Sequence, residues 1–411
     1  MKNYSKIKIS NNLIEKIFTF FVMFILLFSK GMIQSSIMIF VFILYIAYTK
    51  KIIILGNKKY IFVILFLALY SILVVFFNST NDLNLIFRYL RCLISYFLLS
   101  QMFYKSRLDN NEFIKLILFL LFIHSISILI SIILPSSREI FEQFSGYDKK
   151  FLRWRASGLV SGFDFAGILT NIGLILTVYL RNLNKKSLFG ISGLIFILAT
   201  LFTSRTNMIV LLIELLLIFI YLIGNKQYKK SLVILIPMIL LVSVSLFFLI
   251  LTTDIGAQYR EYILSKSNFA RKFYKVIFLT YSNSAYSKAI IDHFYIEPSV
   301  NIWFGSGYKP IFRDPGYTNT IYRIGIFGTI LEIYFYFSML FESLKIYILF
   351  KKINSVINTY ASQLIIIILI TIFMQSKLIF FFSSTIFEIT LILYFLLLRE
   401  RTEFNNEKIK N

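Results

Sequence analysis

The chain has 411 residues, of which 58% are hydrophobic and 15% are charged, and it carries a formal net charge of +23. Its mean hydropathy of +0.77 excludes an ordinary soluble domain. The charge does not indicate nucleic-acid binding, because most basic residues fall between apolar segments, where they set membrane topology.

Apolar segments of about 17–25 residues recur along the chain, and each is long enough to cross the hydrocarbon core of a bilayer. They predict an all-α polytopic membrane protein with about 12 transmembrane helices, built as a single integral membrane domain over residues 1–411. The predicted spans are 13–28, 33–49, 60–77, 84–103, 113–134, 159–180, 188–203, 206–223, 231–252, 319–342, 360–376 and 378–398.

The distribution of Lys and Arg predicts the orientation of these spans. With the N-terminus in the cytoplasm, the inner segments carry 23 basic residues, whereas the short outer turns carry only Lys30, Arg205 and Lys377. This asymmetry follows the positive-inside rule. Both termini are therefore predicted to be cytoplasmic, and two longer segments, about 135–158 and 253–318, are predicted to be outer-face loops.

Cysteine and histidine are too rare to build a metal centre. Cys92 is the one cysteine, which excludes an intrachain disulfide, and the histidines are His124 and His293. No ligand set for haem, an iron–sulfur cluster or zinc is visible, so we expect no metal and no cofactor. His124 falls in the middle of a span, where a helix contact is expected.

Two arginines, Arg88 and Arg91, lie one helical turn apart near the outer end of the fourth predicted span. A charge well inside the bilayer costs about 2.5–3.5 kcal/mol on insertion scales, so such residues usually face a cavity. These two are also shallow enough to reach lipid headgroups. The sequence leaves both interpretations open.

The two outer loops carry a net positive charge that topology does not explain. The first contains Arg153 and Arg155, and Arg155 precedes a span that opens with polar residues at 161–167. Such an opening is typical of a broken helix that lines a cavity. An anionic ligand at the outer face would account for these arginines; binding to lipid phosphates is the alternative.

Arg205 lies in the tight outer turn 203–207 between two spans. The short turn holds Arg205 at the membrane face. A guanidinium presents a rigid fork of donors that matches phosphate oxygens, so Arg205 is a candidate for binding a pyrophosphate. Contact with lipid headgroups is again the alternative.

The second outer loop returns to the membrane through Asp314 and Tyr317, and about two turns later Arg323 enters the tenth span. Gly305 and Gly307, earlier in the loop, permit close backbone approach. Asp314 is a candidate general base or could orient a sugar hydroxyl. A loop cap, or a salt bridge to Arg313 or Arg323, is the alternative role for Asp314.

Three patterns over about 150–340 resemble the Wzy-type oligosaccharide repeat-unit polymerases, which are related to O-antigen ligases. The patterns are Arg155-x-x-Gly158 leading into a span with Ala166, Thr203-x-Arg205 at an outer turn, and Phe304-Gly305-x-Gly307 followed by Asp314-x-Gly316-Tyr317 and Gly325-Ile326-x-Gly328. In the ligases a histidine occurs near the place of Asp314, so its absence favours a polymerase.

The resemblance implies a metal-independent glycosyltransferase in the bacterial cytoplasmic (inner) membrane. Such an enzyme moves a growing glycan from undecaprenyl pyrophosphate onto a sugar hydroxyl of the next lipid-linked repeat unit, building O-antigen of lipopolysaccharide or a capsular polysaccharide. A chain-length regulator protein is a further expected partner. On this reading Arg155 and Arg205 bind pyrophosphate, Arg323, Arg88, Arg91 and Arg153 assist, Asp314 is the base and Tyr317 contacts a sugar.

Three other functions compete with this interpretation. A flippase for lipid-linked oligosaccharides would also have about twelve spans, but its loops are short and its halves match as repeats. An O-antigen ligase is the competitor within the enzyme class. A small-solute transporter is less consistent with the sequence, because no Gly- or Pro-broken spans occupy matching positions in the two halves.

Overall fold

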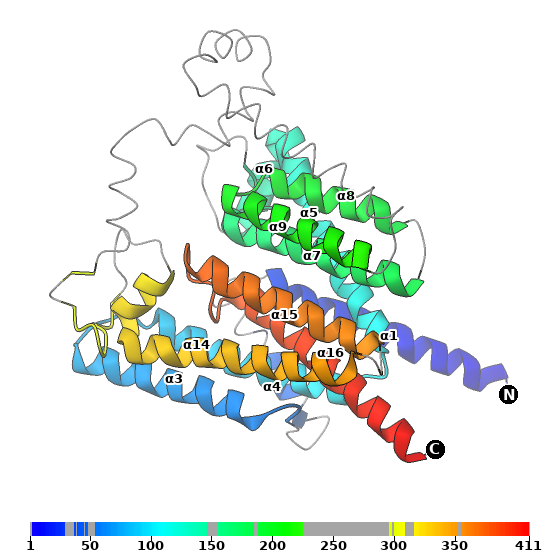
Figure 1. The fold of residues 1–411 in the computed structure, drawn as a ribbon, viewed down its shortest axis with the longest axis horizontal. Coiled ribbons are helices and arrows are strands. Elements are labelled where there is room, and N and C mark those ends of the chain that lie inside the picture. The colour runs from blue at the N-terminus through cyan, green and yellow to red at the C-terminus, as the bar shows by residue number, and fades with distance from the viewer. Residues whose placement is uncertain are drawn as a thin grey trace, which may run out of the picture. The chain divides into compact units, whose positions relative to one another are not determined.

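The computed structural model describes residues 2–28, 37, 39–44, 46–47, 54–145, 155–184, 188–224, 296–297, 300–308, 316–351, 353 and 355–410. This part of the chain consists of helices and their connections, without a strand (Figure 1). The helices are α1 (Lys2–Phe28), α3 (Lys58–Phe77), α4 (Asn84–Lys105), α5 (Asn110–Ile133), α6 (Pro135–Ser145), α7 (Phe163–Asn184), α8 (Leu188–Leu201), α9 (Arg205–Gly224), α14 (Gly316–Phe350), α15 (Ser355–Gln375) and α16 (Ser384–Lys410). The predicted span 231–252, about half of 33–49, and the predicted site residues Arg153 and Asp314 lie outside the described residues.

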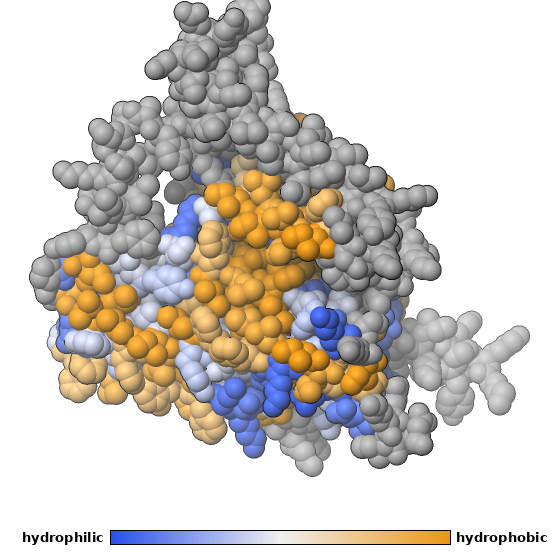
Figure 2. Space-filling view, in the orientation of Figure 1, coloured by the Kyte–Doolittle hydropathy of each residue, from blue (hydrophilic) through white to orange (hydrophobic). Residues whose placement is uncertain are grey.

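Several of these helices suit a membrane. Among the described residues, four helices are long and apolar enough to cross one, namely α3, α5, α14 and residues Val356–Gln375 of α15, while α7, α8 and α9 contain shorter apolar stretches. The face in Figure 2 is apolar over a broad area, and large side chains such as Phe76 and Phe77 of α3 are exposed. The described residues confirm the prediction of an all-α protein with helices that are long and apolar enough to cross a membrane. The count of twelve spans and the cytoplasmic termini stay predictions.

Some predicted boundaries were wrong. Residues 135–145 of the first predicted outer loop form α6, and α7 begins at Phe163, because Gly158 and Gly162 before it have positive φ. The last two predicted spans almost touch, whereas the structure has a non-helical connection over 376–383 between α15 and α16. Hydropathy missed this connection because its apolar residues continue the pattern without Gly or Pro.

The chain forms two compact units. Unit 1 comprises Met1–Leu116 and Ala289–Asn411, and unit 2 comprises Ile117–Lys288. In unit 1, α14 packs against α15 and α3, while α16 packs against α15, α4 and α1. α3 and α15 end, and α4, α14 and α16 begin, at one end of this bundle, which we call the loop end.

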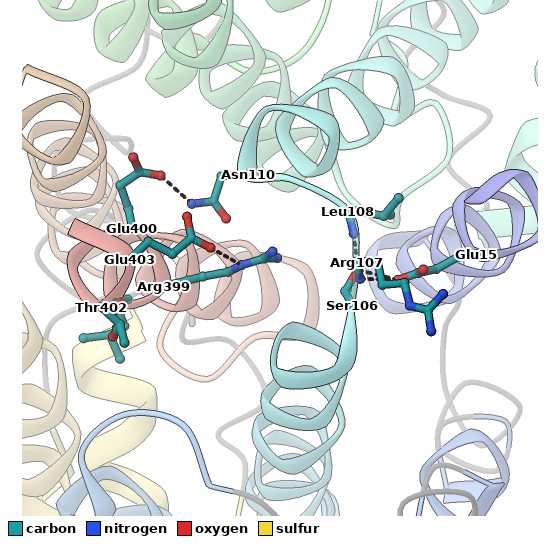
Figure 3. Close-up of polar contacts among 10 residues, drawn as sticks. Glu15, Ser106, Arg107, Leu108, Asn110, Arg399, Glu400, Thr402 and Glu403 are labelled. Atoms are coloured by element: carbon teal, nitrogen blue, oxygen red, sulfur yellow. Dashed lines mark hydrogen bonds and ion pairs between the residues drawn. The ribbon is translucent and has the colours of Figure 1, made fainter. Parts of the chain in front are cut away.

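The opposite end of unit 1 is held by polar contacts of Glu15 and Glu400 (Figure 3). One oxygen of Glu15 accepts hydrogen bonds from the Ser106 hydroxyl at 2.7 Å and the Arg107 amide at 2.8 Å. The Asn110 side chain donates to Glu400 at 2.7 Å. These contacts join α1, α5 and α16 around the turn between α4 and α5. Lys58 and Lys105, predicted as cytoplasmic cations, also belong to this end.

Unit 2 is built around α7, which packs against α8 and α9. Its interior is joined by hydroxyl and amide contacts, such as that between the Thr170 and Thr200 hydroxyls at 2.6 Å. Gly173 allows close packing, because a Cβ there would collide with the ring of Phe196. Small and polar side chains of this kind are typical of helix contacts in membranes, where hydrophobicity does not drive association between helices.

α14 is broken at Gly325, which has φ 66° and ψ −177°. A break leaves backbone groups without helical partners, and the segment 300–308 supplies replacements. The amides of Ile326 and Phe327 donate to the carbonyls of Ile302 and Trp303 at 2.8 and 3.1 Å. In return, the amides of Ser306 and Gly307 donate to the carbonyls of Tyr322 and Arg323 at 2.8 and 3.1 Å. This exchange satisfies the groups that a break inside a membrane would otherwise leave unpaired.

The exchange explains two glycines of the sequence patterns. Gly305 has φ 82° and Gly325 has φ 66°, a region that side chains with a Cβ rarely adopt. A Cβ on Gly325 would collide with the carbonyl of Trp303, and a Cβ on Gly305 would collide with the backbone at Gly325. The two glycines therefore let the segment and the helix break lie in direct backbone contact.

We expect Gly325→Ala to destabilise the protein. A φ of 66° with a ψ of −177° lies in a region open essentially to glycine, which alone costs about 1–3 kcal/mol for a residue with a Cβ, and the collision with Trp303 adds to this cost. Thermal unfolding in detergent measures the effect. The matched control is Gly193→Ala in α8, where a Cβ would have its nearest neighbour at 3.7 Å. Equal melting temperatures for the two variants would contradict the assignment.

Candidate functional site: buried arginines at the loop end of unit 1

The break in α14 positions Arg323 two residues before it. Arg323 is only 4% exposed, and its Nη2 lies 3.5 Å from Oδ2 of Asp82. Asp82 belongs to the turn between α3 and α4. The other oxygen of Asp82, Oδ1, accepts from the backbone and side-chain nitrogens of Asn84 at 3.2 and 2.8 Å. The break and the turn thus fix an arginine and a carboxylate opposite each other.

Two arginines of α4 complete a group that we call the arginine cluster, which consists of Asp82, Arg88, Arg91, Arg323 and Glu332. Arg88 interacts electrostatically with Arg323, Arg91 and Glu332. Glu332, on α14, is fully buried, and its Oε1 accepts a hydrogen bond from the hydroxyl of Tyr89 at 2.7 Å. Three guanidinium groups therefore lie close to the carboxylates of Asp82 and Glu332, and the buried Glu388 also interacts electrostatically with Arg91.

Arg91 has a partly structural role in the cluster. Its Nη2 donates to the carbonyl of Phe382 at 3.3 Å, and the Cys92 thiol lies 3.4 Å from the same oxygen. Phe382 belongs to the connection between α15 and α16 and has a positive φ of 53°. Arg91 therefore helps to hold this connection against α4.

The cluster contains buried polar atoms without hydrogen-bond partners among the described residues. These atoms are Nη1 of Arg88, Nε of Arg91, Nε and Nη1 of Arg323, Oδ2 of Asp82 and Oε2 of Glu332. An unpaired buried donor costs about 1–3 kcal/mol, and more when it is charged. Proteins retain such an arrangement where a ligand completes it, and the donors here suit an anion.

An apolar groove of about 580 Å³ lies between α3 and α4 at the loop end, and its lining contains no residue of the arginine cluster. Its walls are Ile72, Val75 and Phe76 of α3, together with Leu83, Ile86 and Phe87 of α4, and the turn 79–81 supplies polar side chains. Asp82 and Arg88 adjoin these lining residues in the sequence. The loop end therefore has both an apolar groove and a buried cationic group, and α4 contributes residues to each of them.

Unit 2 contains a second arginine-bearing element. Arg155 is half-buried, with its Cζ 5.9 Å from the ring centroid of Phe163, and the amide of Ala156 donates to the carbonyl of Phe202 at 2.9 Å. This bond places the Arg155 segment beside the turn that leads to Arg205. Arg205 is the first residue of α9, and its side chain lies outside the described residues.

His124 anchors the Arg155 segment, as its expected role in a helix contact predicts. Its Nδ1 accepts from the amide of Leu159 at 3.2 Å, and its Nε2 lies 3.3 Å from the carbonyl of Ala166. The two contacts require a neutral ring that carries its proton on Nε2. Gly158, with φ 56°, lies against Ser127 and His124, where a Cβ would not fit.

The structure brings Arg323 close to the predicted pair Arg88 and Arg91, a proximity that the sequence did not reveal. Tyr317 is half-buried, and its hydroxyl donates to the carbonyl of Ile372 on α15 at 3.0 Å, so its predicted sugar contact stays a prediction. The sequence analysis missed Asp82. The available signal was a single acid in a short predicted outer turn, just before an arginine pair.

Other buried carboxylates of unit 1 serve helix contacts. Glu388 accepts a hydrogen bond from Ser95 at 2.8 Å. Glu342 accepts from Tyr60 at 2.7 Å and from Tyr394 at 3.2 Å. Glu388, like Glu332, interacts electrostatically with an arginine as well as a hydroxyl, namely with Arg91.

We expect Tyr89→Phe to destabilise the protein by about 1–3 kcal/mol, because it leaves the buried Oε1 of Glu332 without its donor. The same change at Tyr334, which is 50% exposed on α14, is the matched control and removes an equivalent hydroxyl. Thermal unfolding of both variants checks the effect. A loss of stability at Tyr334 equal to that at Tyr89 would contradict the role of this hydrogen bond.

Taken together, the described residues of unit 1 offer a site for an amphipathic anion, with buried guanidinium groups for the charge and a groove for an apolar chain. No protein-family model, curated protein or solved structure matches this chain.

Proposed function

We propose that this protein polymerises oligosaccharide repeat units linked to undecaprenyl pyrophosphate, acting as a metal-independent glycosyltransferase at the outer face of the bacterial cytoplasmic membrane. The observation that carries the proposal is the set of donors on Arg323 and Arg88 without hydrogen-bond partners among the described residues, at the same end of unit 1 as the apolar groove between α3 and α4. A lipid pyrophosphate combines the two properties that such a site suits, namely a concentrated negative charge and a long apolar chain.

The chemistry requires stabilisation of a leaving group. When the acceptor hydroxyl oxygen bonds to the anomeric carbon, its proton passes to a base, the bond from that carbon to the phosphate oxygen breaks, and the electron pair of that bond leaves with the pyrophosphate. Arginines in a water-poor site stabilise this developing charge without reorganising. Holding both lipid-linked reactants in one geometry supplies much of the remaining acceleration.

The arginines of unit 2 support the same proposal. Arg155 and the turn before Arg205 lie side by side through the bond between Ala156 and Phe202. The reaction uses two lipid-linked pyrophosphates, one on the donor and one on the acceptor. Two arginine-bearing elements in one chain are consistent with two such groups.

We expect the protein, reconstituted in liposomes with undecaprenyl-pyrophosphate-linked repeat units, to produce a ladder of longer glycans. Arg323→Gln should lower kcat by about 10²–10³-fold, the usual effect of removing one donor to a developing anion. Arg399→Gln is the control, because Arg399 lies outside the arginine cluster and pairs with Glu403 on the same helix, α16, at 3.0 Å.

Two results would contradict this proposal. Repeat units that cross the bilayer without elongation would establish a flippase instead. Transfer of finished glycan to a lipid A core, without elongation, would establish a ligase.

The fork geometry of Arg205 gives a separate prediction. Arg205→Lys retains the positive charge but loses bidentate donation to phosphate oxygens. We therefore expect at least about a tenfold loss of kcat/KM, because a bidentate charged contact contributes more than about 1.4 kcal/mol. Ladder formation at varied substrate concentration measures this loss. Full activity of the lysine variant would contradict this prediction, because it would show that Arg205 acts only as a positive charge at the membrane edge.

A further inference from the structure

The segment 300–308, which the sequence places in the second predicted outer-face loop, exposes three large apolar side chains in a row. These are Ile302, Trp303 and Phe304, and Trp303 is 64% exposed. The backbone that carries them is fixed to α14 by the exchange of hydrogen bonds at the helix break. Contact with water is unfavourable for such a surface, and exposed apolar patches mark sites of contact with a membrane or a partner.

Contacts with α3 place this segment well before the end of that helix. The hydroxyl of Tyr70 donates to the carbonyl of Phe304 at 3.2 Å, and Tyr70 lies about two turns, or about 10 Å, before α3 ends at Phe77. The amide of Phe327, whose ring centroid lies 5.3 Å from that of Tyr70, donates to the carbonyl of Trp303. Because α3 is long and apolar enough to cross a membrane, the segment lies alongside the crossing part of α3 rather than beyond it.

The backbone of the segment is paired in a way that permits this depth. Non-helical backbone is tolerated inside a membrane only where protein satisfies its amides and carbonyls. Oδ1 of Asn301 accepts from the amides of Trp303 and Phe304 at 3.2 and 3.1 Å, and the carbonyl of Asn301 accepts from the amide of Gly305 at 2.6 Å. The exchange with α14 pairs four more backbone groups of the segment. The segment can therefore leave water without leaving these groups unpaired.

The exposed side chains continue an apolar surface of the neighbouring helices. Phe66 of α3 and Phe327 of α14 are both exposed, and their ring centroids lie 6.3 Å apart. On helices that cross a membrane, exposed rings of this kind contact lipid. Trp303 adds an indole, a group that is enriched where the apolar core of a bilayer meets its headgroups. Lipid is therefore the partner whose chemistry fits this surface.

We propose that residues 301–307 form a membrane-inserted segment, with Ile302, Trp303 and Phe304 in contact with lipid acyl chains. The inference does not depend on the proposed function, because it rests only on the exposure of these side chains, on the paired backbone, and on the contacts with α3 and α14. The segment belongs to the membrane domain, whereas the sequence predicts it in the water outside.

Tryptophan fluorescence of the protein in liposomes tests this inference. The chain has two tryptophans, Trp154 and Trp303, so the emission lost in Trp303→Phe reports Trp303. In phosphatidylcholine liposomes with brominated acyl chains, Trp303 should lose at least about half of its emission, because its exposed ring meets the chains. Acrylamide, a quencher dissolved in the water, should have little effect. Two variants made on Trp303→Phe calibrate the depth: Phe66→Trp on α3, and Asn81→Trp in the exposed turn after α3.

Trp303 should respond to the two quenchers as Phe66→Trp does. Quenching by acrylamide equal to that of Asn81→Trp, without an effect of the brominated lipid, overturns the inference and leaves the segment in water. Protection from both quenchers also overturns it, because protein rather than lipid would then cover the three side chains.

A second measurement does not use tryptophan. Cys92 is buried, so a cysteine introduced elsewhere can be labelled with a maleimide that does not cross membranes. Phe304→Cys should react at least about tenfold more slowly than Asn81→Cys, because a thiolate is disfavoured in apolar surroundings. Equal rates for the two variants in liposomes overturn the inference.

Discussion

The exchange of backbone hydrogen bonds at Gly325 is the constraint on which the rest of unit 1 depends. A broken helix inside a membrane needs other partners for its amides and carbonyls, and the segment 300–308 provides them one for one. Because the exchange requires backbone contact, glycine is needed at both Gly305 and Gly325. The same contact sets the position of Arg323, whose carbonyl takes part in it.

The charges of the arginine cluster follow from this arrangement. Arg323 is held in the interior by the break, and a lone buried charge is too costly to keep without compensation. Asp82 and Glu332 compensate the charges of Arg323 and Arg88, and Glu388 compensates that of Arg91. The cluster thus combines a rigid backbone with guanidinium donors that lack hydrogen-bond partners among the described residues. These properties favour binding of an anion over a purely structural role.

Unit 2 also holds an arginine-bearing segment in a fixed position, but through other contacts than those of unit 1. Its arginine segment is positioned by His124 and by the bond between Ala156 and Phe202, and its helices pack through hydroxyl and amide side chains. Polar packing of this kind resists rearrangement, because every displaced group would lose a partner in an apolar medium. Each unit therefore presents an arginine on a rigid backbone, which is the property that recognition of a phosphate oxygen requires.

The sequence by itself determined the helical membrane character, the candidate arginines and the importance of the glycine pattern at 304–307 and 325–328. Hydropathy and glycine spacing are properties of contiguous residues, so they can be evaluated without a fold. Only the tertiary structure decided that Gly305 meets Gly325, that Asp82 faces Arg323, and that Tyr89 satisfies Glu332. These partners lie far apart in the chain, and packing between α3, α4 and α14 selects them. The charge of a residue is therefore readable from sequence, but its partner is not.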